Sequence, residues 1–198
     1  MSATSGKTGA AQVNADGNPI YRKNPHPAQA YRITMKIEDA PGPFGYISGV
    51  AGYQMMNHDG CTPVDNHLLG MSTKPNEADI PLQFKKLDES TYIAILYADG
   101  MIDADYYGMG VCRFELIGVG ITLRATGKRE ETRFQPWLIK SDIDKGDPRV
   151  IYFWKGRYPK EEDMDDFPDD GETNVDHFNE KARHNIFKVT LTTEKVSS

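Results

Sequence analysis

The sequence predicts an all-β protein, an antiparallel β-sandwich or open barrel of about eight to nine strands with one short helix near the C-terminus. Three observations lead to this prediction. Residues 31–38 and 186–193 alternate between apolar and polar side chains, as half-buried strands do. Residues 92–98 are an apolar run of the length of one buried strand. Clusters of Gly, Pro, Asp and Ser separate the runs and indicate turns.

The expected elements follow in order from residue 31, where we expect the ordered chain to begin. Residues 31–38 and 46–56 are expected to form a hairpin, because Pro and Gly at 41–43 end the first strand. The apolar run at 92–98 is expected to start a meander of antiparallel strands. The remaining expected elements are strands at 80–87, 111–117, 121–125, 132–139, 150–154 and 186–193, a helical turn at 141–145 and a helix at 175–183.

A chain of 198 residues most simply forms one domain. Residues 1–29 are rich in small and polar residues and show no hydrophobic period, so we expect a flexible leader there. Residues 30–198 are expected to form a single β-sandwich domain. The chain opens on no signal peptide, and no run approaches the ~20 apolar residues of a membrane helix.

The charge of the chain is concentrated in one segment. The net charge is -6, and residues 161–172 hold eight acidic residues and no basic one. The other 21 acidic residues are balanced by 23 basic ones. Because phosphate binding needs a basic surface, nucleic acid is disfavoured as a partner.

The two cysteines, Cys61 and Cys112, allow two interpretations. Cys61 falls in a long polar loop at 57–79 that needs an anchor, and Cys112 falls on the apolar face of an expected strand. A disulfide between them would stabilise the fold by about 4 kcal/mol. Two separate buried thiols are the default in a reducing compartment. The residues alone leave both interpretations open.

Two loops carry residue types that turn chemistry does not require. The first contains Asp105, Tyr106, Tyr107 and Met109, and tyrosine and methionine are enriched at protein interfaces. The alternative is that the tyrosines pack at the end of the sandwich.

The second loop is the acidic segment. Phe167 lies among Asp165, Asp166, Asp169 and Asp170, so the segment could dock on a basic partner with an aromatic anchor. It could also bind calcium through its carboxylates. The plainer interpretation is a solvated run of charge.

The sequence shows no motif that would carry catalysis. The five histidines lack metal-ligand spacing, and residues 45–49 do not have the spacing of a nucleophile elbow. Asp99, Asp103 and Asp105 fit turns better than a glycosidase pair. We therefore expect no enzyme activity, no catalytic residues, no metal and no cofactor.

Several segments together resemble a family of small Gram-negative lipoproteins, whose genes often lie beside those of type VI secretion phospholipase effectors. The likeness runs from about residue 31 to residue 193. The segments that carry it are residues 37–44 (IEDAPGPF), 49–51 (GVA), 105–108 (DYYG), 110–112 (GVC) and 152–159 (YFWKGRYP).

The resemblance implies an immunity protein of the periplasm, which binds a secreted lipase or phospholipase effector and covers its active-site entrance. The two loops above would then make the contact. An oxidising periplasm implies that Cys61 and Cys112 are bridged. In this family a polar spacer follows a lipid-bearing cysteine, and residues 1–27 resemble that spacer. The chain itself contains no lipobox cysteine, so membrane contact would come only through an anchor outside it.

A function of a different class fits the same fold. A β-sandwich of the bacterial cell envelope could instead bind a small ligand, such as a sugar or calcium. Association with a lipase would separate the two functions.

Overall fold

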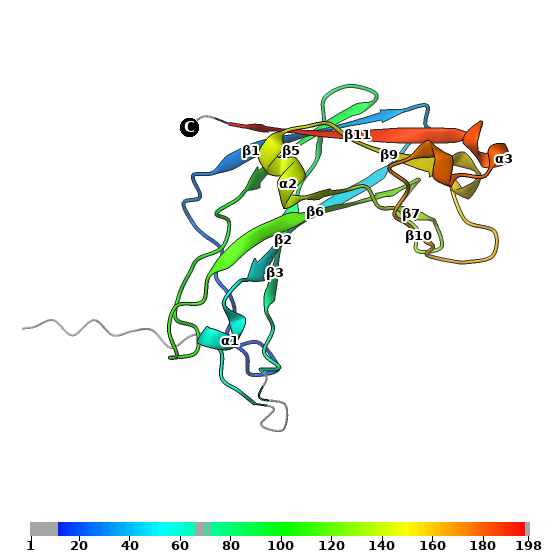
Figure 1. Ribbon diagram of the computed structural model, residues 1–198. Coiled ribbons are helices and arrows are strands. Elements are labelled where there is room, and N and C mark those ends of the chain that lie inside the picture. The colour runs from blue at the N-terminus through cyan, green and yellow to red at the C-terminus, as the bar shows by residue number, and fades with distance from the viewer. Residues whose placement is uncertain (1–11, 66–69, 71, 197–198) are drawn as a thin grey trace, which may run out of the picture.

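The computed structural model, which describes residues 12–65, 70 and 72–196, is mostly strand, with a few short helices (Figure 1). The strands are β1 (Ala30–Glu38), β2 (Tyr46–Met55), β3 (Glu77–Leu82), β4 (Lys85–Lys86), β5 (Thr91–Tyr97), β6 (Phe114–Arg124), β7 (Arg133–Phe134), β8 (Trp137–Ile139), β9 (Arg149–Trp154), β10 (Pro168–Asp169) and β11 (Ile186–Lys195). The helical elements are α1 (His58–Cys61), α2 (Lys140–Lys145), η1 (Lys155–Arg157), η2 (Val175–His177) and α3 (Glu180–Arg183).

The strands form two sheets that pack face to face. One has five strands in the order β4-β5-β1-β11-β9, and its pairings are antiparallel. The other follows the path β10-β7-β6-β2-β3, with β8 paired to β6. Only β10 and β7 pair in parallel within the described part of the chain. The predicted all-β sandwich is confirmed.

The core lies between the sheets because each long strand buries alternate side chains. On β1, Ile33 and Met35 are fully buried and Arg32 faces solvent. Four phenylalanines fill one end of the core, with neighbouring ring centroids 5.2–5.8 Å apart. They are Phe44, Phe134, Phe153 and Phe187. Aromatic rings at these distances stabilise the packing beyond the area they bury.

The expected hairpin of β1 and β2 is wrong, because the two strands belong to different sheets. Residues 39–45 carry the chain across the end of the sandwich. Pro41 and Pro43 cannot donate to a strand ladder, and Phe44 turns into the core between the sheets. β1 pairs with β5 and β11, whereas β2 pairs with β3 and β6.

The expected meander is wrong for a related reason. β5 lies in the five-stranded sheet, and the two strands expected at 111–117 and 121–125 are one long strand, β6, in the other sheet. Gly118 and Gly120 do not turn the chain. Instead, Gly118 lets the backbone of β8 approach β6 closely, since a Cβ there would lie 2.4 Å from the carbonyl oxygen of Leu138.

The number of elements also differs from the expectation. The described residues contain eleven strands and three short α-helices. The strand expected at 80–87 divides into β3 and β4, which belong to different sheets. The helix expected at 175–183 divides into η2 and α3. No helix in the described part of the chain is long and apolar enough to span a membrane.

Residues 12–29 of the expected leader contact the domain at several points; residues 1–11 lie outside the described part of the chain. Lys23 forms a β-bridge with Met101. The carboxylate of Asp99 accepts hydrogen bonds from the backbone N–H groups of Ala28 and Gln29 at 2.8 and 2.9 Å. This segment therefore lies along the domain before β1 begins.

Gly118 and Gly120 provide a matched test of the packing of β8 on β6. Gly118→Ala should lower the free energy of unfolding by about 1–3 kcal/mol, because its Cβ must displace β8. A Cβ at Gly120 would meet no atom within 4 Å, so Gly120→Ala should be neutral or slightly stabilising. Chemical denaturation measures both effects. Equal stability of the two variants would contradict this packing.

Candidate functional site

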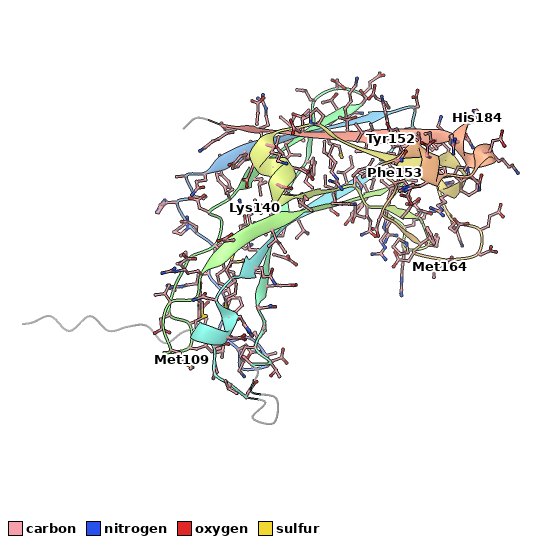
Figure 2. The ribbon with its side chains drawn as sticks, viewed as in Figure 1. Met109, Lys140, Tyr152, Phe153, Met164 and His184 are labelled. Carbon is pink, nitrogen blue, oxygen red and sulfur yellow. A yellow bond between two sulfur atoms is a disulfide. The ribbon has the colours of Figure 1, made fainter. Side chains whose placement is uncertain are left out.

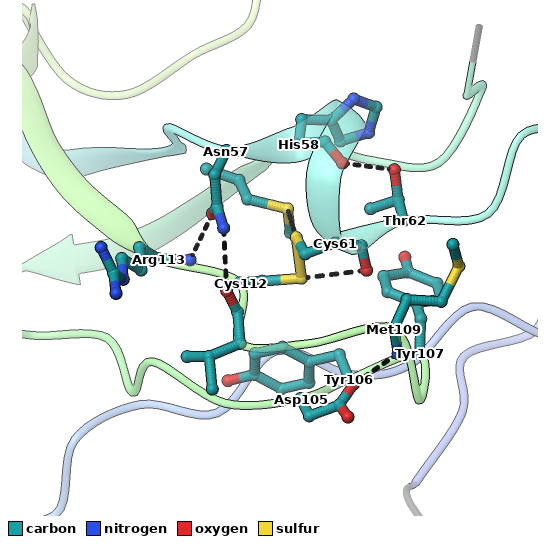
Figure 3. The surroundings of a disulfide bond; sticks show 12 residues. Asn57, His58, Cys61, Thr62, Asp105, Tyr106, Tyr107, Met109, Cys112 and Arg113 are labelled. Carbon is teal, nitrogen blue, oxygen red and sulfur yellow. Dashed lines mark hydrogen bonds between the residues drawn. A yellow bond between two sulfur atoms is a disulfide. The ribbon is translucent and has the colours of Figure 1, made fainter. Parts of the chain in front are cut away.

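A disulfide between Cys61 and Cys112 joins two segments that lie outside both sheets (Figure 3). Cys61 ends α1, and Cys112 precedes β6. Their Cα atoms are 5.3 Å apart, and the residues are 51 positions apart in the chain. The sequence leaves open a disulfide or two separate thiols, and the structure contains the disulfide. We call this region the disulfide end.

A small hydrophobic cluster surrounds the disulfide, separate from the core between the sheets. The sulfur of Met55 lies 3.3 Å from that of Cys61. The ring of Tyr21 packs on those of Tyr106 and Phe114, with centroids 5.1 and 5.0 Å apart. The buried members of the cluster are Met55, Cys61, Tyr106 and Cys112.

Asn57 joins the two disulfide-bonded segments from the side. Its amide nitrogen donates to the carbonyl oxygen of Val111, and its amide oxygen accepts from the backbone N–H of Arg113, both at 2.8 Å (Figure 3). The backbone N–H of Met56 donates to the carbonyl oxygen of Arg113 at 2.8 Å. These bonds fix the register of the two segments. An Asn in a polar loop gives no sequence signal of this role.

The loop predicted to bind a partner is shaped by Asp105. Its carboxylate accepts hydrogen bonds from the backbone N–H groups of Gly108 at 2.6 Å and Met109 at 3.0 Å. Gly108 has a φ of +75°, which favours glycine. Asp105 therefore holds the turn that presents Met109, whose side chain is 51% exposed.

The two tyrosines of this loop face the molecule. Tyr106 is buried, and its hydroxyl donates to the carbonyl oxygen of Ile102 at 2.8 Å. Tyr107 is half-buried, and its hydroxyl lies 2.9 Å from that of Tyr21. Of the four residues predicted here, Asp105 and Met109 are exposed, Tyr107 is partly exposed and Tyr106 is buried.

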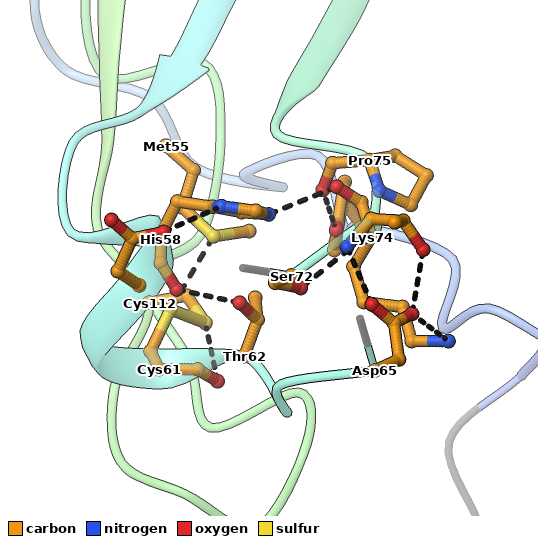
Figure 4. Close-up of polar contacts among 12 residues, drawn as sticks. Met55, His58, Cys61, Thr62, Asp65, Ser72, Lys74, Pro75 and Cys112 are labelled. Carbon is orange, nitrogen blue, oxygen red and sulfur yellow. Dashed lines mark hydrogen bonds and ion pairs between the residues drawn. A yellow bond between two sulfur atoms is a disulfide. The ribbon is translucent and has the colours of Figure 1, made fainter. Parts of the chain in front are cut away.

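The long loop after α1 is fastened by polar contacts (Figure 4). The ring nitrogen Nε2 of His58 lies 2.9 Å from the carbonyl oxygen of Lys74, and the hydroxyl of Thr62 donates to the carbonyl oxygen of His58 at 2.6 Å. The carboxylate of Asp65 accepts two hydrogen bonds from Thr73, at 2.7 Å each. These bonds, followed by the contact with Lys74, lower the pKa of Asp65 to about 2.

Tyr21 connects the segment before β1 to this end. Its hydroxyl hydrogen-bonds to the carbonyl oxygen of Pro75 and lies beside the hydroxyl of Tyr107. Burial, followed by the contact with Tyr107, raises the pKa of Tyr21 well above its usual value. The sequence did not single out Tyr21, because residues 1–29 show no hydrophobic period.

Four large apolar side chains at the disulfide end face solvent. Their exposed fractions lie between 40% and 56%. They extend from the segments that the disulfide, Asn57 and Asp105 hold in place. These side chains are Met56, Val64, Met109 and Val111, which we call the tip surface.

The acidic segment lies at the other end of the molecule. Figure 2 labels Met109 at the disulfide end and Met164, within the acidic segment, at the opposite end. The structure therefore does not bring together the two loops that were expected to make one contact.

Most of the predicted acidic residues are occupied by ion pairs within the chain. Asp166 lies 2.5 Å from Arg124 and 2.9 Å from Arg133. Asp165 pairs with Lys160. Asp165 and Asp166 are thus paired with basic residues of the same chain, whereas Glu162, Asp163 and Asp170 form no ion pair with the described residues.

Asp169 is buried and pairs with Arg157 at 3.1 Å. Burial raises the pKa of its carboxyl, and Arg157 opposes this rise. Phe167 is half-buried, with the Arg157 guanidinium 4.8 Å from its ring centroid. Asp170 is exposed. Phe167 therefore does not project as a free anchor.

The polar clusters offer no metal centre in the part of the chain that the structure describes. No three His, Cys, Asp or Glu side chains gather there in a way that could hold a metal ion. Asp103, one of the three aspartates compared with a glycosidase pair, accepts a hydrogen bond from the backbone N–H of Phe114 at 2.9 Å. It serves the local backbone, as turn chemistry predicts.

Comparisons with protein-family models, with curated proteins and with solved structures found no match to this chain.

The disulfide should account for a large part of the stability of the protein. Replacing both Cys61 and Cys112 by Ala should lower the free energy of unfolding by about 4 kcal/mol, because the unfolded chain gains the entropy of an open loop. Chemical denaturation without reductant measures the loss. Thiol titration of the denatured parent protein should find no free thiol; two free thiols would contradict the bridge.

Proposed function

We propose that this protein is an immunity protein that binds a type VI secretion lipase or phospholipase effector and inhibits it by covering its active-site entrance. The observation that carries the proposal is the tip surface, a group of apolar side chains exposed on a braced backbone. The sequence resemblance to effector-linked lipoproteins names the class of partner.

Rigidity makes the tip surface suited to binding. Transfer of exposed methionine and valine side chains from water into an interface with a partner is energetically favourable. The disulfide and the Asn57 hydrogen bonds already order the backbone beneath Met56 and Val111. Association therefore loses little backbone entropy, so more of the contact energy contributes to affinity.

The partner's chemistry fits the same surface. An enzyme that cleaves lipids must admit acyl chains, so its entrance accepts apolar groups. Methionine adapts to irregular apolar surfaces because its side chain is unbranched and flexible. Met56 and Met109 could therefore occupy an entrance that normally accepts lipid.

The acidic segment has a smaller role in the contact than the sequence suggested. Asp165, Asp166 and Asp169 are paired with bases of the same chain, so they contribute little free charge to steer a partner. Within the predicted loop, Met109 makes the contact and Tyr107 lies at its edge. Asp105 and Tyr106 hold the loop in place.

The disulfide also supports the proposed compartment. Structural disulfides persist in oxidising compartments such as the periplasm and are rare in the cytosol. We propose the periplasm as the compartment in which the protein acts. The protein would act by binding and would have no hydrolase activity of its own.

A pair of matched methionine variants tests the contact surface. Met109→Glu should weaken binding to the phospholipase effector at least tenfold, because a carboxylate would have to be desolvated at the interface. Met164→Glu, with a similarly exposed methionine at the other end, should bind like the parent. Binding kinetics and residual lipase activity measure both effects.

The two variants also define how the proposal fails. Parent-like inhibition by the Met109 variant would move the contact away from the tip surface. An equal loss in the Met164 variant would show that the acidic end takes part. If the parent protein neither binds nor inhibits any type VI lipase, the function itself is wrong.

A further inference from the structure

A cavity of about 480 Å³ opens at the end of the sandwich away from the disulfide. Strand β9, elements η1 and η2, strand β10 and helix α3 contribute to its walls. Figure 2 shows this end around Phe153 and His184, far from Met109. Its size is within the range of small-molecule sites. The side chains that decide its chemistry are Trp154, Arg157, Asp169, Glu172, Phe178 and Lys181.

Trp154 and Phe178 give the cavity an aromatic wall, and both are half-buried. The indole of Trp154 lies against the backbone at Gly156. A Cβ at Gly156 would be 2.3 Å from the indole, so glycine is required for this position. The indole therefore packs on the backbone at Gly156, and Trp154 also lines the cavity.

The carboxylates of the cavity are already paired. Asp169 is buried and accepts hydrogen bonds from Arg157 at 3.1 Å and from the backbone N–H of Gly171 at 3.0 Å. One carboxylate oxygen of Glu172 lies 2.7 Å from the ring of His177. The other oxygen of Glu172 makes no hydrogen bond to the described residues, so it can accept one from a ligand hydroxyl.

Lys181 is the basic residue of the cavity that takes part in none of these pairs. It lines the cavity, is exposed, and forms no ion pair with the residues that the structure describes. One positive charge is therefore offered to a ligand, which matches a singly charged carboxylate better than a doubly charged phosphate.

We propose that this cavity binds a pyranose sugar that carries one carboxylate, as uronic acids do. The sugar's C–H groups would pack on Trp154, because the face of an aromatic ring is negative and attracts them. A hydroxyl would donate to Glu172, and the carboxylate would pair with Lys181. This site is independent of the tip surface and of the partner proposed above.

Tryptophan fluorescence tests the site, because Trp154 and Trp137 are the two tryptophans of the chain. Trp137→Phe leaves Trp154 as the sole reporter. Glucuronate should change its emission saturably, with dissociation in the millimolar range. Saturation-transfer NMR should show glucuronate bound to the parent protein, and this NMR signal should be lost in Trp154→Phe.

Charge variants separate the sugar from a simple anion. Lys181→Met should weaken glucuronate binding at least fivefold, whereas Lys195→Met, on β11 away from the cavity, should leave it unchanged. Neutral glucose should bind more weakly than glucuronate and be insensitive to Lys181→Met. Inorganic phosphate should not compete.

Three results would overturn the proposal. The first is the absence of both the fluorescence and the NMR signal with glucuronate. The second is an unchanged affinity in the Lys181 variant. The third is competition by phosphate at an equal concentration, which would identify an anion site. None of these results bears on inhibition of a lipase.

Discussion

The disulfide between Cys61 and Cys112 is the constraint on which the candidate binding end depends. Two segments meet there without belonging to either sheet, and the cluster around them buries only Met55, Tyr106 and the two cysteines among the described residues. So small a cluster gains little from hydrophobic burial. The covalent bond removes much of the entropy cost of bringing the segments together, and the polar contacts of Asn57 and Asp105 then set the local shape.

The two ends of the sandwich are stabilised by different interactions, and this difference determines what each can bind. At the disulfide end, polar side chains hydrogen-bond to the backbone, and apolar side chains remain exposed. At the other end, Arg124, Arg133 and Arg157 gather carboxylates of the acidic segment. Most surface ion pairs add little stability, but a buried carboxylate such as Asp169 needs its partner. The acidic segment therefore folds onto its own chain.

The sequence predicted the strands better than their connections. Alternation in β1 and β11 is visible without a structure, because half-buried strands show it directly. Pro41 and Pro43 mark the end of a strand, yet they do not tell whether the chain returns in the same sheet or crosses to the other. Gly118 suggests a turn in the sequence, but in the structure it is the point where β8 approaches β6.

The candidate site was predictable in part for similar reasons. Met109 lies in a loop whose composition is typical of protein interfaces, and its exposure fits the prediction that this loop binds a partner. Tyr106 belongs to the same loop but is buried. This burial could not be predicted, because periodicity and composition do not give the direction of a side chain in a turn. Arg124 lies 42 residues from Asp166, so no local pattern reveals their pairing.

Hydrogen exchange of the complex with the phospholipase effector tests the central claim most directly. Slowed exchange at residues 56–65 and 104–113, with 161–172 unchanged, is the result we predict; protection confined to 161–172 or to the sheets would contradict it.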